Sequence, residues 1–483
     1  MRKILPVVLA GLLAGCSTAA YRAPEVPVPS TYSAGGVTPA ATASRDPSEE
    51  IPASVVRVST TPASVPFWTD LGDSTLTRLV REAQRANTDV QIAQSRLMSA
   101  RASRRLAAFD LVPSITAAGS STRFQSSLAQ TPGLTSQLPS VQLWDVGFDA
   151  SWEVDIFRRV GRNVRARSAL AESSEYGLED VQVSVAAEVA RTYFDLRGAQ
   201  RLLAVSGRNA ENQRKIVKLT EDRLAAGRGT AFDTERAKSV LYLTLATTPG
   251  LETQIALDRN RLAVLLGRAP EALPAALLDS GALPHLPDTV FVGTPDQLVR
   301  RRPDILRAER QLAAQALFVG AAQADYLPRV TLGARAGYQA TAVDSLFRRG
   351  YSRLLFGPTI TFPLFDLGRV RERVKVAQAG QDEAQASYNA TILRALEESE
   401  GSLVTYDRAH VRLAILESAV RSSTRALDLA QQRFEAGLTD FLQVLDAERT
   451  LLDAENQLTQ AHTAAAIALV AVYKAVGGTW PIR

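Results

Sequence analysis

The sequence has one cysteine, Cys16, and only three histidines among its 483 residues. A single cysteine excludes a disulfide framework and a zinc site built from cysteines. His285, His410 and His462 are scattered without the spacing of metal ligands. The chain also lacks a phosphate-binding loop and a nucleophile with a partner histidine. We therefore expect no enzyme activity, no metal and no cofactor.

Aromatic residues are also scarce, at 6%, whereas Ala, Leu, Gln, Arg and Glu dominate. This composition is typical of long packed helices. The formal net charge is +5, with both signs well mixed along the chain. Because no Lys/Arg block or aromatic stacking motif accompanies this charge, we expect no nucleic-acid partner.

The apolar run near the N-terminus is too short to span a membrane as a helix. It covers Ile4–Leu13 and follows two basic residues, whereas a spanning helix needs about 20 apolar residues. A basic start followed by a short apolar core predicts a secretory signal over residues 1–15.

The end of this signal, Leu13-Ala14-Gly15-Cys16, resembles the bacterial lipobox. The resemblance implies that Cys16 is lipidated and becomes the first residue of the mature chain. Its three acyl chains would hold the protein firmly in outer membrane lipid. Ser17 resembles the residue found in lipoproteins that are sorted to the outer membrane. The alternative is a buried cysteine within an ordinary signal.

Residues 16–66 are predicted to be an extended tether over the folded body, because they are rich in Pro, Ser, Thr, Ala and Val. Eight prolines between Arg22 and Pro66 disfavour regular structure there. We expect Phe67 and Trp68 to dock the tether.

Two glycines mark the same reversal in two helical hairpins, Gly227 and Gly437. Glycine just past a helix end supplies the left-handed cap that other residues adopt only with strain. The sequences around both glycines correspond, and a second register relates the stretches upstream. Pairs related in this way include Arg223 and Arg433, Ala237 and Ala447, Asp89 and Asp304, and Pro113 and Pro328. We infer an internal duplication, in which each half reads helix, two strands, long helix, tip and shorter helix.

Apolar periodicity and end signals place the helices and strands. Each long helix would measure about 100 Å. Each return helix is about half as long, and we expect it to stack end to end with the first helix of its half. Pro249-Gly250 should interrupt the first return helix. The predicted parts are repeat 1 (67–266), with a helix to about 109, strands 114–124 and 141–154, long helix 160–226 and return helix 230–266; an equatorial linker (267–295); repeat 2 (296–476), with a helix, strands 330–341 and 351–365, long helix 370–436 and return helix 439–476; and a C-terminal tail (477–483).

Three of the four strands alternate between apolar and polar residues, which is typical of a membrane β-barrel, whereas Ser114–Phe124 alternates poorly. A soluble sandwich with one wet face is the alternative. Open edges are not tolerated in hydrocarbon, and four strands cannot close alone. Several chains must therefore share one barrel. Two chains would give a filled barrel, and three would give twelve strands with room for a pore.

Several motifs together resemble the TolC-like outer membrane efflux proteins, in their lipidated branch. The motifs are the lipobox, Arg301-Arg302-Pro303-Asp304-Ile305, Asp325-Tyr326-Leu327-Pro328, Phe365-Asp366-Leu367-Gly368-Arg369, Ala436-Gly437 and Leu445-Asp446-Ala447. The first half has Arg158 where a glycine is usual. The resemblance implies a mixed α and β fold, mostly α: a homotrimer with a 12-stranded transmembrane barrel continued by an α-helical periplasmic barrel. Its tips, at Gly227 and Gly437, would meet a periplasmic adaptor joined to an inner-membrane resistance-nodulation-division pump.

In this family the duct narrows near acidic residues after the second tip. That position here holds Leu442, Asp446 and Arg449, which the resemblance implies to form an aperture or gate. Asp446 and Arg449 are three residues apart and share a helix face, so a simple intrahelical pair is the alternative. Gln443 is neutral where some relatives carry a second carboxylate.

Other functions within and outside the family remain alternatives. A duct for type I protein secretion or for metal export would have the same architecture. A membrane-tethered coiled-coil scaffold would explain the helices but not the four alternating strands.

Overall fold

The computed structural model describes residues 21, 24, 27–32, 56–61, 67–130, 133, 135–272, 277, 281, 283–284, 286–287 and 289–478. The predicted signal, Cys16, His285, most of the predicted tether and the last five residues lie outside the described residues, as does the side chain of Phe67. The chain divides into two compact units. Unit 1 comprises residues 1–25, 96–175 and 307–389, and unit 2 comprises residues 26–95, 176–306 and 390–483.

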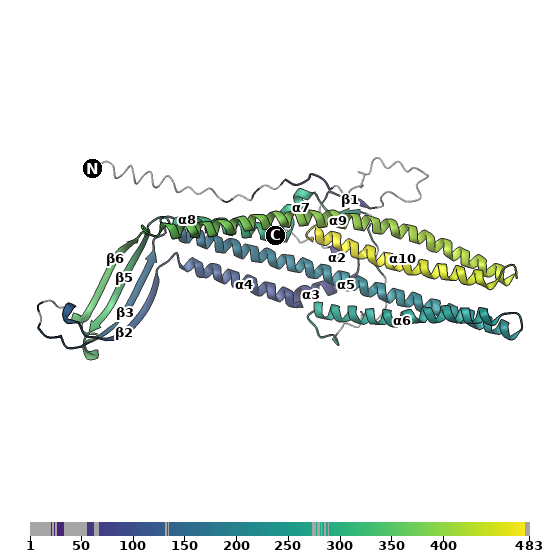
Figure 1. Cartoon of the computed structure of the whole chain (residues 1–483), viewed down its shortest axis with the longest axis horizontal. Helices are drawn as coiled ribbons and strands as arrows, with labels where there is room; N and C mark the ends of the chain where they lie inside the picture. The colour runs from purple at the N-terminus through teal and green to yellow at the C-terminus, as the bar shows by residue number, and fades with distance from the viewer. Residues whose placement is uncertain are drawn as a thin grey trace. The chain divides into compact units, whose positions relative to one another are not determined.

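Unit 1 contains a four-stranded antiparallel sheet (Figure 1). Its strands are β2 (Ser114–Phe124), β3 (Val141–Glu153), β5 (Arg329–Ala340) and β6 (Ser352–Thr361), in the order β2-β3-β5-β6. The 3-10 turns η1 (Leu128–Gln130), η3 (Val343–Ser345) and η4 (Arg349–Tyr351) lie in the loops between β2 and β3 and between β5 and β6. In the described part of the chain, no strand pairs with the outer side of β2 or of β6, so the sheet has two open edges.

The two faces of this sheet differ in chemistry. The register places Phe148 opposite Ala336, and Ala336 opposite Leu354. Large apolar side chains on this face are exposed, and the exposed fraction reaches 81% at Leu354. The other face carries paired charges: Arg335 lies 3.0 Å from Asp149, and Arg353 lies 2.6 Å from Asp145. This alternation of apolar and polar faces follows from the period of two in a strand.

Unit 1 also contains parts of four helices: α4 (Thr88–Phe109), α5 (Arg159–Ala225), α8 (Pro303–Ala324) and α9 (Leu367–Glu435), whose remaining residues belong to unit 2. Within unit 1, α5 and α8 pack through small side chains, namely Ala166, Ala169, Ala313 and Ala314. Small residues allow close approach of two helices. With 67 and 69 residues, α5 and α9 are each about 100 Å long at 1.5 Å per residue.

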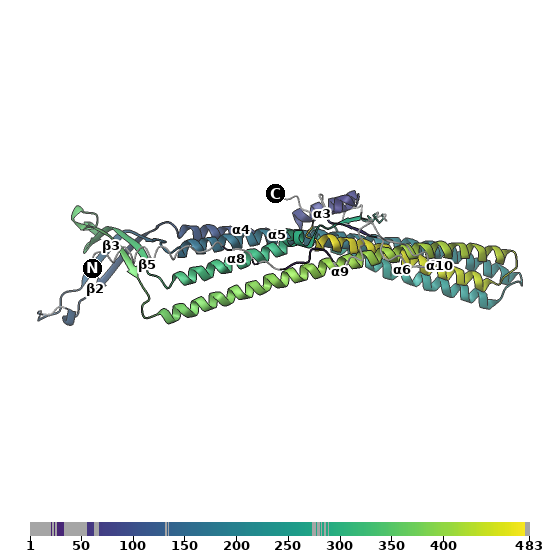
Figure 2. The ribbon, with the colours of Figure 1, turned by 90° about the horizontal axis from the view of Figure 1, so that it is seen from above.

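Unit 2 is built around the return helices α6 (Ala231–Leu265) and α10 (Phe441–Ala475). Figures 1 and 2 show α6 running back beside the end of α5, and α10 beside the end of α9. The smaller elements are α2 (Phe67–Asp70), α3 (Ser74–Ala86), α7 (Pro295–Arg301), and the parallel pair of β1 (Arg57–Ser59) with β4 (Thr289–Phe291). One large apolar core joins them, and it includes Trp68, Tyr193, Phe194 and Tyr406.

The prediction of a single first helix was wrong, because the helix is interrupted at Asn87, between α3 and α4. Asn87 has an extended backbone (ψ 135°). Its side-chain oxygen accepts the Asp89 N–H at 2.8 Å, which caps α4. Its side-chain nitrogen donates to the carbonyl of Leu265 at 2.9 Å, which satisfies the end of α6. A buried asparagine thus serves two helix ends at once.

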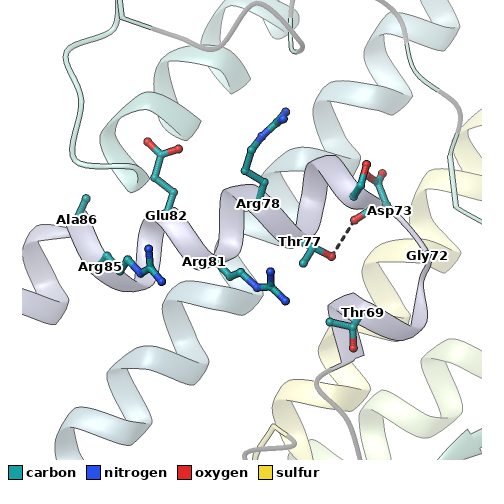
Figure 3. A pocket seen from close by; sticks show the side chains of 10 residues that line it. Thr69, Gly72, Asp73, Thr77, Arg78, Arg81, Glu82, Arg85 and Ala86 are labelled. Carbon is teal, nitrogen blue, oxygen red and sulfur yellow. Dashed lines mark hydrogen bonds between the residues drawn. The ribbon is translucent and has the colours of Figure 1, made fainter.

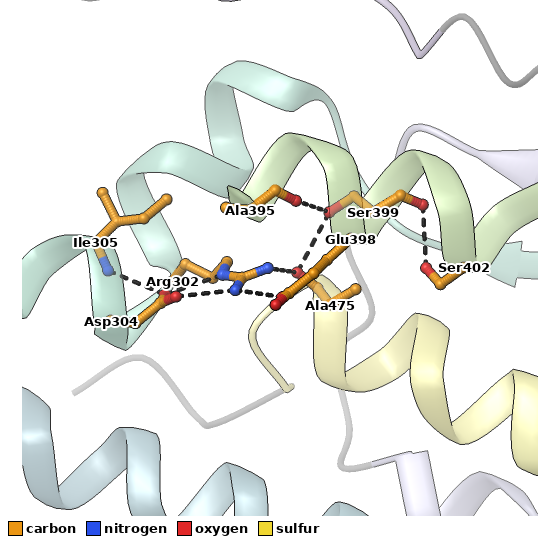
Figure 4. Close-up of polar contacts among 8 residues, drawn as sticks. All are labelled: Arg302, Asp304, Ile305, Ala395, Glu398, Ser399, Ser402 and Ala475. Carbon is orange, nitrogen blue, oxygen red and sulfur yellow. Dashed lines mark hydrogen bonds and ion pairs between the residues drawn. The ribbon is translucent and has the colours of Figure 1, made fainter. Parts of the chain in front are cut away.

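Arg302 breaks the chain between α7 and α8 in the same way (Figure 4). Its guanidinium donates to the carbonyl of Ala475 at 2.8 Å, at the end of α10. It also donates to Asp304 through two nitrogens, at 2.9 and 2.8 Å, and to Glu398 of α9 at 2.6 Å. The side chain is 8% exposed. One residue therefore fixes the start of α8, the middle of α9 and the end of α10.

Two further predictions need correction. The predicted tether contributes a strand, since β1 lies at Arg57–Ser59 and pairs with β4. The fourth strand of the sheet ends at Thr361, not 365, because Pro363 has no N–H to donate. Pro249-Gly250 does not end the first return helix, since α6 continues through Pro249, and the kink expected there stays a prediction. The other observed helix and strand ends lie within three residues of the predicted ones.

We predict that Arg302→Gln lowers the free energy of unfolding of unit 2 by about 3 kcal/mol, because it breaks a buried, multiply bonded charge network. Arg301→Gln is the matched control, since Arg301 is adjacent and exposed. Thermal unfolding followed by circular dichroism measures both variants. Equal stability of the two would show that the Arg302 network contributes little.

Candidate functional site

The two hairpin tips of unit 2 have the same backbone geometry. After α5, the N–H of Gly227 donates to Leu224 at 3.0 Å, and the N–H of Arg228 donates to Arg223 at 2.9 Å. After α9, Gly437 donates to Phe434 at 3.0 Å and Leu438 donates to Arg433 at 2.8 Å. These are Schellman caps, and both glycines have positive φ, 72° and 73°. The return helices then start at N-caps Thr230 and Asp440.

A small apolar cluster holds the two hairpins together just below the tips. It contains Ala237 of α6, Ala430 of α9, and Phe441, Val444 and Leu445 of α10. The rings of Phe434 and Phe441 lie 5.4 Å apart. The guanidinium of Arg223, on α5, lies 4.4 Å from the centroid of the Phe434 ring. This cation–π contact links the first hairpin to the second.

The predicted aperture residues lie together on the exposed side of α10. Leu442 is 45% exposed, and Asp446 and Arg449 are both exposed. The structure describes both side chains, and no ion pair joins Asp446 to Arg449. The simple intrahelical pair is therefore not formed. The backbone carbonyl of Asp446 accepts from Thr450 at 2.8 Å, as in an ordinary helix. The side chains of Leu442, Asp446 and Arg449 are therefore accessible to other molecules.

Sequence reasoning missed one residue at this site, Glu448. Its side chain is buried, and its Oε2 has no hydrogen-bond partner. Burial raises the pKa of Glu448 from 4.5 to about 7. The signal was in the sequence, since Phe441, Val444, Leu445 and Glu448 follow the i, i+3, i+4, i+7 spacing of one helix face. A carboxylate at such a position predicts a buried charge.

A cavity of about 750 Å³ lies along α3, and none of the predicted site residues lines it (Figure 3). Arg81 and Arg85 extend from one side of α3 and Arg78 from the other. Glu82 is paired with Arg268, and Asp73 caps α3. The cavity is thus a basic surface of unit 2.

Nothing in the described ranges suggests a metal centre, because no three His, Cys, Asp or Glu side chains there converge. His410 packs against Tyr406, with ring centroids 4.6 Å apart.

The helices were also tested for membrane spans. Over the described residues, none combines the length and the low charge that a spanning helix requires.

The chain resembles known proteins over most of its length. The family model described as "Outer membrane efflux protein" matches residues 79–268 and 294–478. Outer membrane protein OprJ of Pseudomonas aeruginosa is 32% identical over 411 residues, which are 84% of this chain and 85% of OprJ. Nodulation protein T of Rhizobium leguminosarum bv. trifolii is 29% identical, over 94% of this chain and 92% of that protein. The solved outer-membrane channel OprN has a TM-score of 0.86 and 34% identity, covering 97% of this chain and 100% of OprN.

We predict opposite effects of alanine at two glycines of the second hairpin. Gly437→Ala should destabilise the tip by about 1 kcal/mol, because alanine is strained at positive φ. Gly401→Ala should stabilise α9 by about 0.5–1 kcal/mol, because Gly401 lies inside the helix with open space around it. Hydrogen exchange of residues 430–441 and 395–405 measures the two effects. Equal protection in both variants would contradict the left-handed cap.

Proposed function

Since this chain belongs to the outer membrane efflux protein family, we propose that it is the passive exit duct of a tripartite efflux system. The family match and the OprJ and OprN similarities together place it in the outer membrane as a TolC-like transport component. In that role it carries substrates outward from an inner-membrane pump.

The observation that carries the duct is the four-stranded sheet with two open edges. Its exposed apolar face suits lipid and its charged face suits a watery lumen. Unpaired strand edges are not tolerated in hydrocarbon, so β2 and β6 must pair with other copies. Twelve strands from three copies leave room for a pore, whereas eight from two copies are filled by side chains. The proposed assembly is therefore a homotrimer.

The proposed duct continues from the barrel through the helices of both halves. The two halves have the same element order and the same helix-end contacts: Asn87 donates to Leu265, and Arg302 donates to Ala475. This correspondence supports an internal duplication of one helical unit. Three copies of a duplicated unit would surround the duct with six similar hairpins.

We assign the tips to the periplasmic adaptor and the aperture to α10. Gly227 and Gly437 end the long helices, and exposed apolar side chains lie next to them, including Leu438, which is 71% exposed. Leu442, Asp446 and Arg449 would face the duct axis. Three copies of Asp446 brought together would repel one another and attract cations.

The Cys16 lipid is a further part of the proposal. Three acyl chains on this residue would anchor the protein in outer membrane lipid independently of the barrel.

We predict a small, cation-preferring single-channel conductance for the purified protein in a planar bilayer. Asp446→Ala should raise the conductance, because it removes the repelling and narrowing ring. Asp453→Ala is the control, since Asp453 is an exposed carboxylate further along α10 whose side chain bonds Gln457. If well-folded oligomer forms no channels, the proposed duct would be refuted and the membrane-tethered scaffold would be favoured. An unchanged conductance in Asp446→Ala would move the aperture elsewhere.

We predict that Cys16→Ser abolishes acylation of the mature protein. Metabolic labelling with radioactive palmitate, followed by immunoprecipitation, measures it. The wild-type protein should be labelled and the variant should not. Label retained on the variant would place the lipid elsewhere, and an unlabelled wild type would show that the cysteine belongs to an ordinary signal.

A further inference from the structure

Glu448 is a buried carboxyl group that the proposed duct does not yet use. It lies on the inner face of α10, one turn after Val444 and Leu445 of the apolar tip cluster. Only 8% of the residue is exposed, and its Oε2 has no accessible surface and no hydrogen-bond partner. A neighbouring copy can only add to this burial. Within this chain, Oε2 can therefore gain a hydrogen-bond partner or water only if α10 itself moves.

The corresponding position of the first hairpin carries the opposite charge, and that charge is paired. The 210-residue offset that relates Gly227 to Gly437 relates Lys238 to Glu448. Lys238 is paired, with its amine 3.0 Å from Glu221 of α5. The residue that corresponds to Glu221 in the second hairpin is Gln431, which is exposed and neutral. The first hairpin thus has a satisfied charge where the second has an unsatisfied one.

The charged groups around Glu448 do not offset its burial. The helices packed with this part of α10 are α5, α6 and α9. Burial raises the pKa of Glu448, and among the described side chains none forms an ion pair with it. On its own helix, Asp446 and Arg449 lie on the exposed side. The stretches of α5, α6 and α9 that pack at the tip cluster carry charges of both signs. These are Lys215, Lys218, Glu221 and Asp222 of α5, Glu235, Arg236 and Lys238 of α6, and Arg425, Asp428 and Arg433 of α9.

We propose that Glu448 is a proton-sensitive latch of the aperture. When neutral, it stays packed below the tip cluster and holds the first turns of α10 in place. When ionised, it must reach water, because an unpaired carboxylate is costly in an apolar setting. The movement that exposes it also displaces Leu442, Asp446 and Arg449, which share the same two turns of helix. This inference rests on the proposed duct, whose opening it would control.

The direction of the pH effect follows from linkage. In the packed state the pKa of Glu448 is about 7, and in a state exposed to water it returns toward its ordinary value near 4.5. Below pH 4.5 both states are protonated and pH has no influence. Between these values the exposed state releases its proton first, so rising pH favours opening. Because one proton is involved, the opening equilibrium of each protomer changes at most about tenfold per pH unit, and it levels off above pH 7.

The experiment measures open probability in planar bilayers from pH 4.5 to 8, using the full-length oligomer. An Asp446→Asn background removes the titration of the aperture carboxylate. In this background, opening should rise from pH 5 to 7 and then level off. Glu448→Gln and Glu448→Leu should both abolish the pH step. Asp453→Asn, a substitution of an exposed carboxylate on the same helix, should preserve it.

Hydrogen exchange of residues 441–450, corrected for the intrinsic pH dependence, provides a readout that needs no channel. Protection should fall between pH 5 and 7 in the parent and stay constant in both Glu448 variants. Conducting channels with the same pH response in parent and Glu448 variants would overturn the latch and leave the duct intact. Absence of conductance would refute the duct, and exchange would then decide separately whether Glu448 controls the packing of α10.

Discussion

The open edges of the sheet are the constraint on which the rest of the architecture depends. A four-stranded sheet with an exposed apolar face and unpaired backbone groups at β2 and β6 is not stable in lipid by itself. In the proposed assembly, these edges pair with further copies of the chain. The number of copies then determines the width of the lumen. The paired charges Asp145–Arg353 and Asp149–Arg335 lie on the face that would line this lumen. Their neutralisation in pairs leaves selectivity to a narrower part of the duct.

The helices meet a second constraint, which is that each helix end has unsatisfied backbone groups. Asn87 and Arg302 meet it in the same place of each half, by breaking one helix and capping the end of a return helix. The two residues differ in charge, and Arg302 additionally binds Glu398 on α9. At this position the second half is therefore held by the ionic bonds of Arg302, whereas the first half uses the neutral amide of Asn87. This difference bears on the proposed latch, because the latch requires α10 of the second hairpin to move.

Much of the fold was predictable because its signals are local. Period-two alternation located the strands at Val141–Glu153 and Arg329–Ala340, and glycine caps located both tips. The helix interruptions at Asn87 and Arg302 were not predicted, since each side chain binds a carbonyl that lies 178 or 173 residues away in sequence. The strand at Arg57–Ser59 was missed for the same reason, as its partner lies at Thr289–Phe291. Leu442, Asp446 and Arg449 were predicted as aperture residues through family resemblance, and this role stays a prediction. Glu448 was not predicted, although helical spacing from Phe441 and Val444 places it on the buried face of α10.

We propose that this chain functions only as a closed assembly of three copies. Native mass spectrometry of the full-length protein, extracted from outer membranes in mild detergent, tests it most directly. We expect one dominant species with three times the mass of the mature lipidated chain. A dominant monomer or dimer that still forms conducting channels would contradict it.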